Sequence, residues 1–127
     1  MATILVVDDA PVVRMAIRKV LELVAHKVIE CGNGCDAADL LAGGIDIDLL
    51  ITDILMPEVD GLELLAKFRR ERPNVPVVAI SGGGLIDSRT CLEMAESLGV
   101  AASLRKPFEA DELLGTVKRL LDARAAH

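Results

Sequence analysis

Five short apolar segments alternate along the chain with longer segments in which apolar residues recur every three to four positions. The short segments are rich in β-branched residues and comprise residues 4–7, 27–31, 49–52, 75–80 and 101–104. Uninterrupted apolar runs of this length are typical of parallel strands that are covered on both faces. The pattern therefore predicts five buried parallel strands.

The segments between these strands carry the signals of helices. The first and the last follow a helical period through Val12, Val13, Ala16, Ile17, Val20, Leu21 and Val24, and through Leu113, Leu114, Val117, Leu120 and Leu121. Pro11 suits a first helical turn, and Gly99 follows residues 93–98 as a helix C-terminal glycine. Because crossovers between parallel strands are right-handed, five strands alternating with five helices predict an α/β fold. We expect a doubly wound, flavodoxin-like parallel sheet of order 2-1-3-4-5.

Length and the N-terminal sequence limit the class of protein. A chain of 127 residues suits one compact core, so residues 1–127 are expected to form a single domain. No apolar run exceeds about six residues, far below the roughly 18 of a membrane span, and no signal peptide precedes Asp8. We expect a cytoplasmic protein without a membrane segment. The last helical pattern runs almost to the end of the sequence, so no attached output domain is expected.

Charge limits the kinds of binding partner, and the cysteine pattern limits the kinds of cross-link and metal site. Fourteen basic against twenty acidic residues give a net charge of −6, and the only aromatic side chains are Phe68 and Phe108. Direct nucleic-acid binding is therefore not expected, because it needs basic and stacking side chains, and the partner should be a protein. Cys31, Cys35 and Cys91 are odd in number and form no CxxC pair, which favours buried free thiols over disulfides or a zinc site.

Polar side chains follow the predicted strands at their carboxyl ends, where open α/β sheets bind ligands. Asp8 and Asp9 follow the first strand, Asp53 the third, Ser81 the fourth, and Lys106 lies just beyond the fifth. In the predicted strand order the first, third, fourth and fifth strands are neighbours. All five side chains are therefore expected to converge on one crevice.

Three carboxylates in one crevice repel one another by roughly 4 kcal/mol per pair at about 4 Å, so they must take up protons or hold a cation. Oxygen ligands without histidine or cysteine favour a hard ion, and a small, partly hydrated site suits Mg²⁺ better than Ca²⁺. Lys106 and the Ser81 hydroxyl can then donate to an incoming anion. A phosphoryl group is the natural anion, and a carboxylate can accept it as an acyl phosphate.

Four motifs in this order resemble the receiver domain of two-component response regulators over essentially the whole chain. They are Val7-Asp8-Asp9, the run from Asp53-Ile54-Leu55-Met56-Pro57 to Gly61, Ile80-Ser81-Gly82, and Lys106-Pro107-Phe108. The resemblance implies that Asp53 is the phosphoacceptor, Asp9 a direct metal ligand and Asp8 a ligand acting through water. The backbone carbonyl of Leu55 would complete the protein's share of the coordination sphere.

The same resemblance assigns the remaining site residues. Ser81 would be the switch hydroxyl, Lys106 the ion-pair partner of the phosphoryl group, and the Lys106–Pro107 bond cis. Ser103 stands where such domains usually carry a switch tyrosine or phenylalanine, so aromatic coupling to the hydroxyl cannot operate there. Leu55 is apolar where many relatives carry a polar side chain that influences the attacking water, which leads us to expect slow loss of the phosphoryl group.

The resemblance implies a stand-alone response regulator that is phosphorylated by a histidine kinase and is not an enzyme beyond its own phosphorylation and dephosphorylation. Its output surface would comprise the fourth helix, the fifth strand and the fifth helix. A phosphorelay carrier serving a histidine phosphotransfer protein is the alternative. An aspartyl-phosphate hydrolase is weaker, because Asp46-Ile47-Asp48 precedes its apolar run instead of following it. A dinucleotide fingerprint at residues 31–37 would leave Asp8, Asp9 and Lys106 unexplained.

Overall fold

The computed structural model describes residues 2–54, 61–82, 93, 96–97 and 99–125. In chain order the elements are β1 (Thr3–Val7), α1 (Pro11–Glu22), β2 (Lys27–Cys31), α2 (Gly34–Ala42), β3 (Leu49–Asp53), α3 (Gly61–Glu71), β4 (Val77–Ser81), β5 (Ala102–Arg105) and α5 (Ala110–Ala125). All five strands pair in parallel in the order β2-β1-β3-β4-β5, which confirms the predicted sheet.

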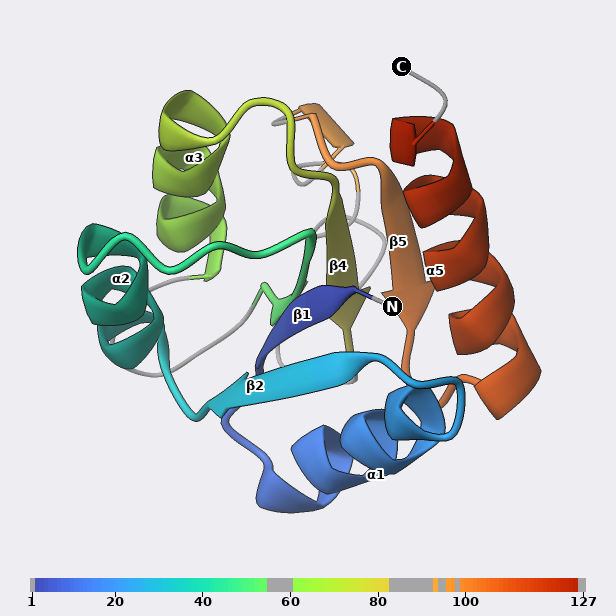
Figure 1. The fold of residues 1–127 in the computed structure, drawn as a ribbon. Coiled ribbons are helices and arrows are strands. Elements are labelled where there is room, and N and C mark those ends of the chain that lie inside the picture. Colours follow the sequence, from blue (N-terminus) through green and yellow to red (C-terminus); the bar gives the residue numbers. More distant parts are fainter. Residues whose placement is uncertain (1, 55–60, 83–92, 94–95, 98, 126–127) are drawn as a thin grey trace.

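Helices cover both faces of the sheet, with α1 and α5 on one side and α2 and α3 on the other (Figure 1). Four of the five predicted helices are present in the described part of the chain. The remaining one, between β4 and β5, falls mostly outside the described residues, although Glu93, Glu96 and Ser97 have helical backbone. Gly99 has a φ of 88°, in keeping with the predicted glycine after a helix end.

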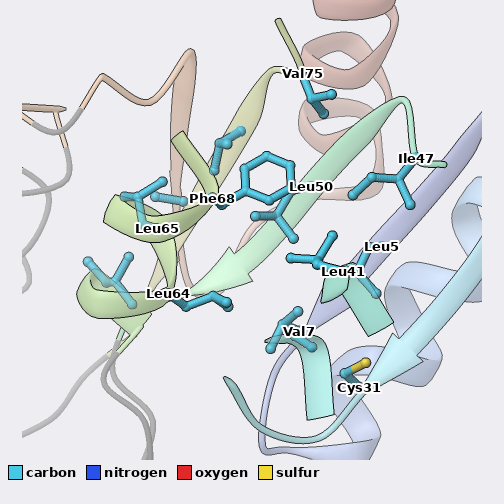
Figure 2. Packing of buried hydrophobic residues seen from close by; sticks show 14 residues of the cluster. Leu5, Val7, Cys31, Leu41, Ile47, Leu50, Leu64, Leu65, Phe68 and Val75 are labelled. Carbon is cyan, nitrogen blue, oxygen red and sulfur yellow. The ribbon is translucent and has the colours of Figure 1, made fainter. Parts of the chain in front are cut away.

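Two apolar cores explain the uninterrupted runs in the strands. Alternate residues of a strand point to opposite faces, so Leu5 joins the core under α2 and α3, whereas Ile4 joins the core under α1 and α5. Phe68 of α3 is 1% exposed and lies in the first core with Leu50 and Val75 (Figure 2). Because both faces are covered, every position of β3 and β4 is buried.

The first helix differs from its predicted apolar face at both ends. Ile17 and Leu21 are buried as expected, but Val12 is 79% exposed. Val12 belongs to the first turn of α1, which begins beyond the carboxyl end of β1 and so lies past the sheet surface that packs Ile17. Val24 lies after the end of α1 and is 48% exposed.

The loop between β2 and α2 has a structural role in place of the dinucleotide fingerprint. Asn33 caps α2, because its side-chain oxygen accepts a hydrogen bond from the Asp36 amide at 2.8 Å.

No helix in the described part of the chain is long and apolar enough to cross a membrane.

Candidate functional site

The chemistry-bearing residues lie at the carboxyl edge of the sheet. Asp8 directly follows β1, Asp53 and Ser81 are the last residues of β3 and β4, and Lys106 directly follows β5. The strand register aligns these ends, since Asp53 pairs with Ile80 across β3 and β4. The structure thus places the residues singled out in the sequence at one edge, apart from Leu55, which lies outside the described residues.

Three carboxylates form the centre of this edge. Asp8, Asp9 and Asp53 each offer an oxygen, and these oxygens lie within 4.8 Å of one another. Asp8 is fully buried and Asp53 is 6% exposed, whereas Asp9 is exposed. Such a cluster is unfavourable without positive charge, because burial removes the water that would screen the repulsion.

Lys106 supplies part of that charge. Its Nζ lies 2.7 Å from Asp8 Oδ2 and 3.1 Å from Asp53 Oδ2, where it donates a hydrogen bond. The ion pair with Asp8 is the shorter of the two. Burial alone would lower the pKa of the Lys106 ammonium, but the carboxylates of Asp8 and Asp53 outweigh burial and raise it above its ordinary value. Lys106 is therefore firmly charged.

The path of the lysine side chain depends on Gly82, which follows Ser81 in the Ile80-Ser81-Gly82 motif. A Cβ atom on Gly82 would lie 2.9 Å from Lys106 Cδ and 3.4 Å from its Cβ. The backbone of Gly82 has no positive φ, so it is space for the lysine that glycine provides here. Lys106 is also fixed through its own backbone, because its amide donates to the Ser81 carbonyl at 2.7 Å. The Lys106–Pro107 bond is cis, as expected.

The Ser81 hydroxyl is fully buried, and its Oγ has no hydrogen-bond partner among the described residues. Buried hydroxyls are nearly always hydrogen-bonded, and an unpaired one costs stability. The neighbouring buried hydroxyl, Thr52 Oγ1, donates to the Asp53 carbonyl at 3.0 Å. Unlike Thr52, Ser81 therefore has a hydroxyl at the carboxyl edge of the sheet that can donate a hydrogen bond to a bound group.

The donor set fits a small divalent cation. Three carboxylate oxygens within 4.8 Å and one ammonium leave two negative charges in excess when all four groups are ionised. The ligands that the described residues offer are oxygens, which Mg²⁺ prefers, and the exposed Asp9 leaves the site open to water.

Two further sequence expectations have mixed outcomes. Cys31 is buried as predicted, but Cys35 is exposed, because it lies in the first turn of α2 outside the core. Cys91 lies outside the described residues. Ser103 is a partly buried residue of β5 that pairs with Ala79 of β4. A serine here carries no ring that could turn between two positions.

The chain matches the family model of the response regulator receiver domain over residues 4–118. It is 36% identical over 124 residues to the chemotaxis protein CheY homolog of Campylobacter jejuni, covering 89% of this chain and 92% of that protein. It is 34% identical over 122 residues to the DNA-binding transcriptional regulator NtrC of Azospirillum brasilense, covering 96% of this chain. The chain spans only 24% of the length of that regulator.

Solved structures agree with the fold. NtrX from Brucella abortus superimposes with a TM-score of 0.87 at 30% identity, covering 98% of this chain and 28% of that one. A receiver domain protein from Clostridium thermocellum gives a TM-score of 0.89 at 24% identity, which supports the fold alone. Together with the aspartate cluster at the carboxyl edge of the parallel sheet, these matches identify the chain as a member of the response regulator receiver domain family.

Proposed function

We propose that Asp53 accepts a phosphoryl group from a phosphohistidine in a Mg²⁺-dependent reaction, and that the chain works as a cytoplasmic signalling switch. The observation that carries the proposal is Lys106 Nζ, held 2.7 Å from Asp8 and 3.1 Å from Asp53 beside a third carboxylate. An acidic cluster with two buried carboxylates and a fixed lysine is suited to receiving a dianionic group together with a divalent ion.

The transfer follows from the positions of these side chains. An Asp53 carboxylate oxygen attacks phosphorus while the N–P bond of the phosphohistidine breaks, and the departing imidazole keeps the electron pair and takes up a proton. Asp53 loses its carboxylate charge on phosphorylation, so the Lys106 ammonium exchanges its bond with Asp53 Oδ2 for one with a phosphoryl oxygen. The Ser81 hydroxyl donates to another phosphoryl oxygen. Asp8, Asp9 and Asp53 would hold a Mg²⁺ ion, whose positive charge would offset the charge on the transferred oxygens.

The donor protein needs a surface beside Asp53. Val12 and Met15 of α1 are 79% and 53% exposed. Val12 lines a hollow of about 640 Å³ shared by α1 and the start of α5, and Lys106 and Phe108 line it too. Because Lys106 joins this hollow to the acceptor, an apolar helix face next to the donor histidine can dock here while the histidine reaches Asp53. A histidine kinase or a histidine phosphotransfer protein is the partner we propose.

Incubation with acetyl phosphate and Mg²⁺, followed by intact-mass measurement, tests the acceptor. The wild type should gain one phosphoryl group, and Asp53→Asn and a wild-type sample in EDTA should gain none. Asp46→Asn, which changes an exposed aspartate away from the cluster, is the matched control and should behave as the wild type. An adduct on Asp53→Asn, or sustained turnover of an unrelated phosphoester as expected of a hydrolase, would contradict the proposal.

The output is proposed to pass through β5, α5 and the segment between β4 and β5, as a stand-alone regulator without enzymatic activity on other substrates. The relatives support two arrangements, since the chain spans 92% of the CheY homolog but 24% of NtrC. An immunoblot of the native host with antibody against this domain decides between them by size. A phosphorelay role would instead appear as efficient return of label from Asp53 to a phosphotransfer protein.

The lifetime of the acyl phosphate depends on water reaching it. The side chain of Leu55 has no polar atom to orient that water, so Leu55→Asn should lose the phosphoryl group faster than the wild type. A lifetime in Leu55→Asn that equals or exceeds the wild-type value would contradict this expectation.

A further inference from the structure

Arg14 of α1 reaches the residue that begins the carboxylate cluster. Its Nη1 donates to the backbone carbonyl of Asp8 at 2.6 Å, and its Nε donates to Glu30 Oε1 on β2 at 3.3 Å. The arginine side chain is 18% exposed, so the bond to the carbonyl is shielded from most competing water. We propose that Arg14 is a positioning residue for the cation pocket, an inference that rests on the Mg²⁺ dependence proposed above.

The bond acts on the peptide that joins two of the carboxylates. The Asp8 carbonyl belongs to the planar unit that also contains the Asp9 amide, so fixing the carbonyl fixes the direction in which Asp9 leaves the strand. Asp8 has other restraints, because its amide donates to the Cys31 carbonyl at 3.1 Å and its Oδ1 accepts from the Ala10 amide at 2.9 Å. Asp9 is exposed, and the peptides on its two sides set its direction: the Asp8 carbonyl is held by the Arg14 side chain, and the Ala10 amide by Asp8 Oδ1.

Two neighbours hold the guanidinium in place. Glu30 Oε1 pairs with Arg14, and Glu30 Oε2 pairs with Arg18 at 2.8 Å. The carboxylate is therefore fixed between two arginines. Arg18 in turn pairs with Glu22 on its own helix at 3.1 Å. Arg14 therefore points at the Asp8 carbonyl in a set orientation, which lowers the entropy lost in making that bond.

Gly32, which follows β2, gives the guanidinium its room. A Cβ atom on Gly32 would lie 3.3 Å from Arg14 Nη1, tighter than an ordinary van der Waals contact. Gly32 has no positive φ, so an alanine is compatible with the backbone, and its Cβ would push the Arg14 guanidinium aside by a few tenths of an ångström. Gly32→Ala therefore disturbs Arg14 while leaving the arginine and its charge in the protein.

Charge and position predict opposite results, which makes the inference testable. If Arg14 acted only as a nearby positive charge, removing it would raise the affinity for a dication, because like charges repel. If Arg14 positions the Asp8–Asp9 peptide, removing it lowers that affinity, on the order of 10-fold for a residue that orients a ligand. The sign of the change therefore separates the two roles.

The experiment is calorimetric titration of the metal-free protein with Mg²⁺ for the wild type, Arg14→Met, Arg14→Lys and Arg18→Met. Arg14→Met should bind Mg²⁺ roughly 10-fold more weakly, and Arg14→Lys, which keeps the charge but not the two-pronged geometry, should regain only part of the loss. Arg18→Met also removes a Glu30 partner but leaves the Arg14 bond to Asp8 in place, so it should lose clearly less Mg²⁺ affinity than Arg14→Met. In EDTA, the NMR amide shift of Asp9 should move in Arg14→Met and Gly32→Ala.

The outcomes are distinct. Equal or tighter Mg²⁺ binding by Arg14→Met, or an equal loss in Arg18→Met, would overturn the positioning role while leaving the proposed function intact. A wild type that binds no Mg²⁺ and takes no phosphoryl group would overturn both. Thermal denaturation in EDTA shows whether Arg14→Met is folded. If it is not, Gly32→Ala is titrated in its place, and a Mg²⁺ affinity equal to that of the wild type would overturn the inference.

Discussion

Lys106 and Asp53 are 53 positions apart in the sequence, yet Lys106 Nζ donates to Asp53 Oδ2 at 3.1 Å. The same nitrogen lies 2.7 Å from Asp8 Oδ2, so one ammonium serves two carboxylates that are themselves almost fully buried. Removing the ammonium would take away a positive charge that Asp8 and Asp53 share. The stability of the protein should then depend on what replaces that charge.

Lys106→Met should lower the free energy of unfolding in EDTA by about 2 kcal/mol, a value reduced from that of a fully buried pair because Lys106 is 23% exposed. Added Mg²⁺ should then raise the melting temperature more than it does in the wild type, because the ion no longer competes with the ammonium. Circular dichroism melts with and without Mg²⁺ measure both effects.

Lys118→Met is the matched control for that experiment. Lys118 pairs with Asp122 at 2.9 Å, one helical turn along α5, but both side chains are largely exposed. Such a pair contributes about 0.5 kcal/mol or less. Equal Mg²⁺-induced shifts in Lys106→Met and the wild type would show that the lysine does not shape the cation site.

Ser81→Ala should separate stability from chemistry. Because the buried Ser81 Oγ has no partner in the described part of the chain, its removal should leave the unphosphorylated protein equally stable or more stable by up to about 1 kcal/mol. Acetyl phosphate should nevertheless modify Asp53 more slowly, by roughly 10-fold or more, since a donor to the phosphoryl oxygens is lost. Urea denaturation and intact-mass time courses give the two quantities.

The neighbouring Thr52 provides the contrast. Its hydroxyl is also buried but donates to the Asp53 carbonyl, so Thr52→Val should lose about 1 kcal/mol of stability. A Ser81→Ala protein that loses as much stability as Thr52→Val would mean that the serine hydroxyl already has a structural partner. A phosphorylation rate in Ser81→Ala equal to that of the wild type would show that the serine hydroxyl takes no part in the transfer.

Much of the fold follows from the sequence, because the strands are uninterrupted apolar runs and right-handed crossovers leave few ways to order them. The carboxyl-edge cluster follows too, since Asp8, Asp53 and Lys106 each come directly at or after a strand end. The exposure of Val12 could not be predicted, because a helical period does not show where the sheet beneath the helix ends.

Arg14, Gly32 and Gly82 escape sequence reasoning for a different reason. Arg14 binds a backbone carbonyl and a glutamate 16 positions away, and neither contact leaves a pattern in the sequence. The two glycines resemble ordinary loop glycines, yet neither has a positive φ, and each leaves room for a long cationic side chain. Only the folded arrangement brings those side chains over them.

The two described thiols should react very differently. Cys35 is exposed, whereas Cys31 is buried, and burial raises the pKa of the Cys31 thiol to about 11. Iodoacetamide should therefore modify Cys35 in the folded protein and reach Cys31 only after unfolding, because the thiolate is the nucleophile. Peptide mass mapping with and without guanidinium chloride resolves each cysteine, and equal labelling of both in the folded state would contradict the burial of Cys31.

His26 should make stability depend on pH at the other end of the sheet, where its Nδ1 accepts a hydrogen bond from the Ala2 amide at 3.1 Å. Burial lowers the pKa of His26 below 6.5 in the folded protein. As the pH falls below about 6.5, His26 is protonated in the unfolded chain before it is protonated in the folded protein, which favours unfolding. The stability that the neutral His26 contributes is therefore complete above about pH 6.5 and is lost as the pH falls toward the folded pKa.

His26→Gln cannot take up that proton. Its stability should fall less than that of the wild type when urea denaturation is repeated from about pH 7.5 down to about pH 5.5. The carboxylates contribute equally to both proteins, so the difference between the two curves isolates the histidine. Parallel curves would mean that His26 is protonated as easily in the folded as in the unfolded chain, and a steeper fall in His26→Gln would reverse the sign of its contribution.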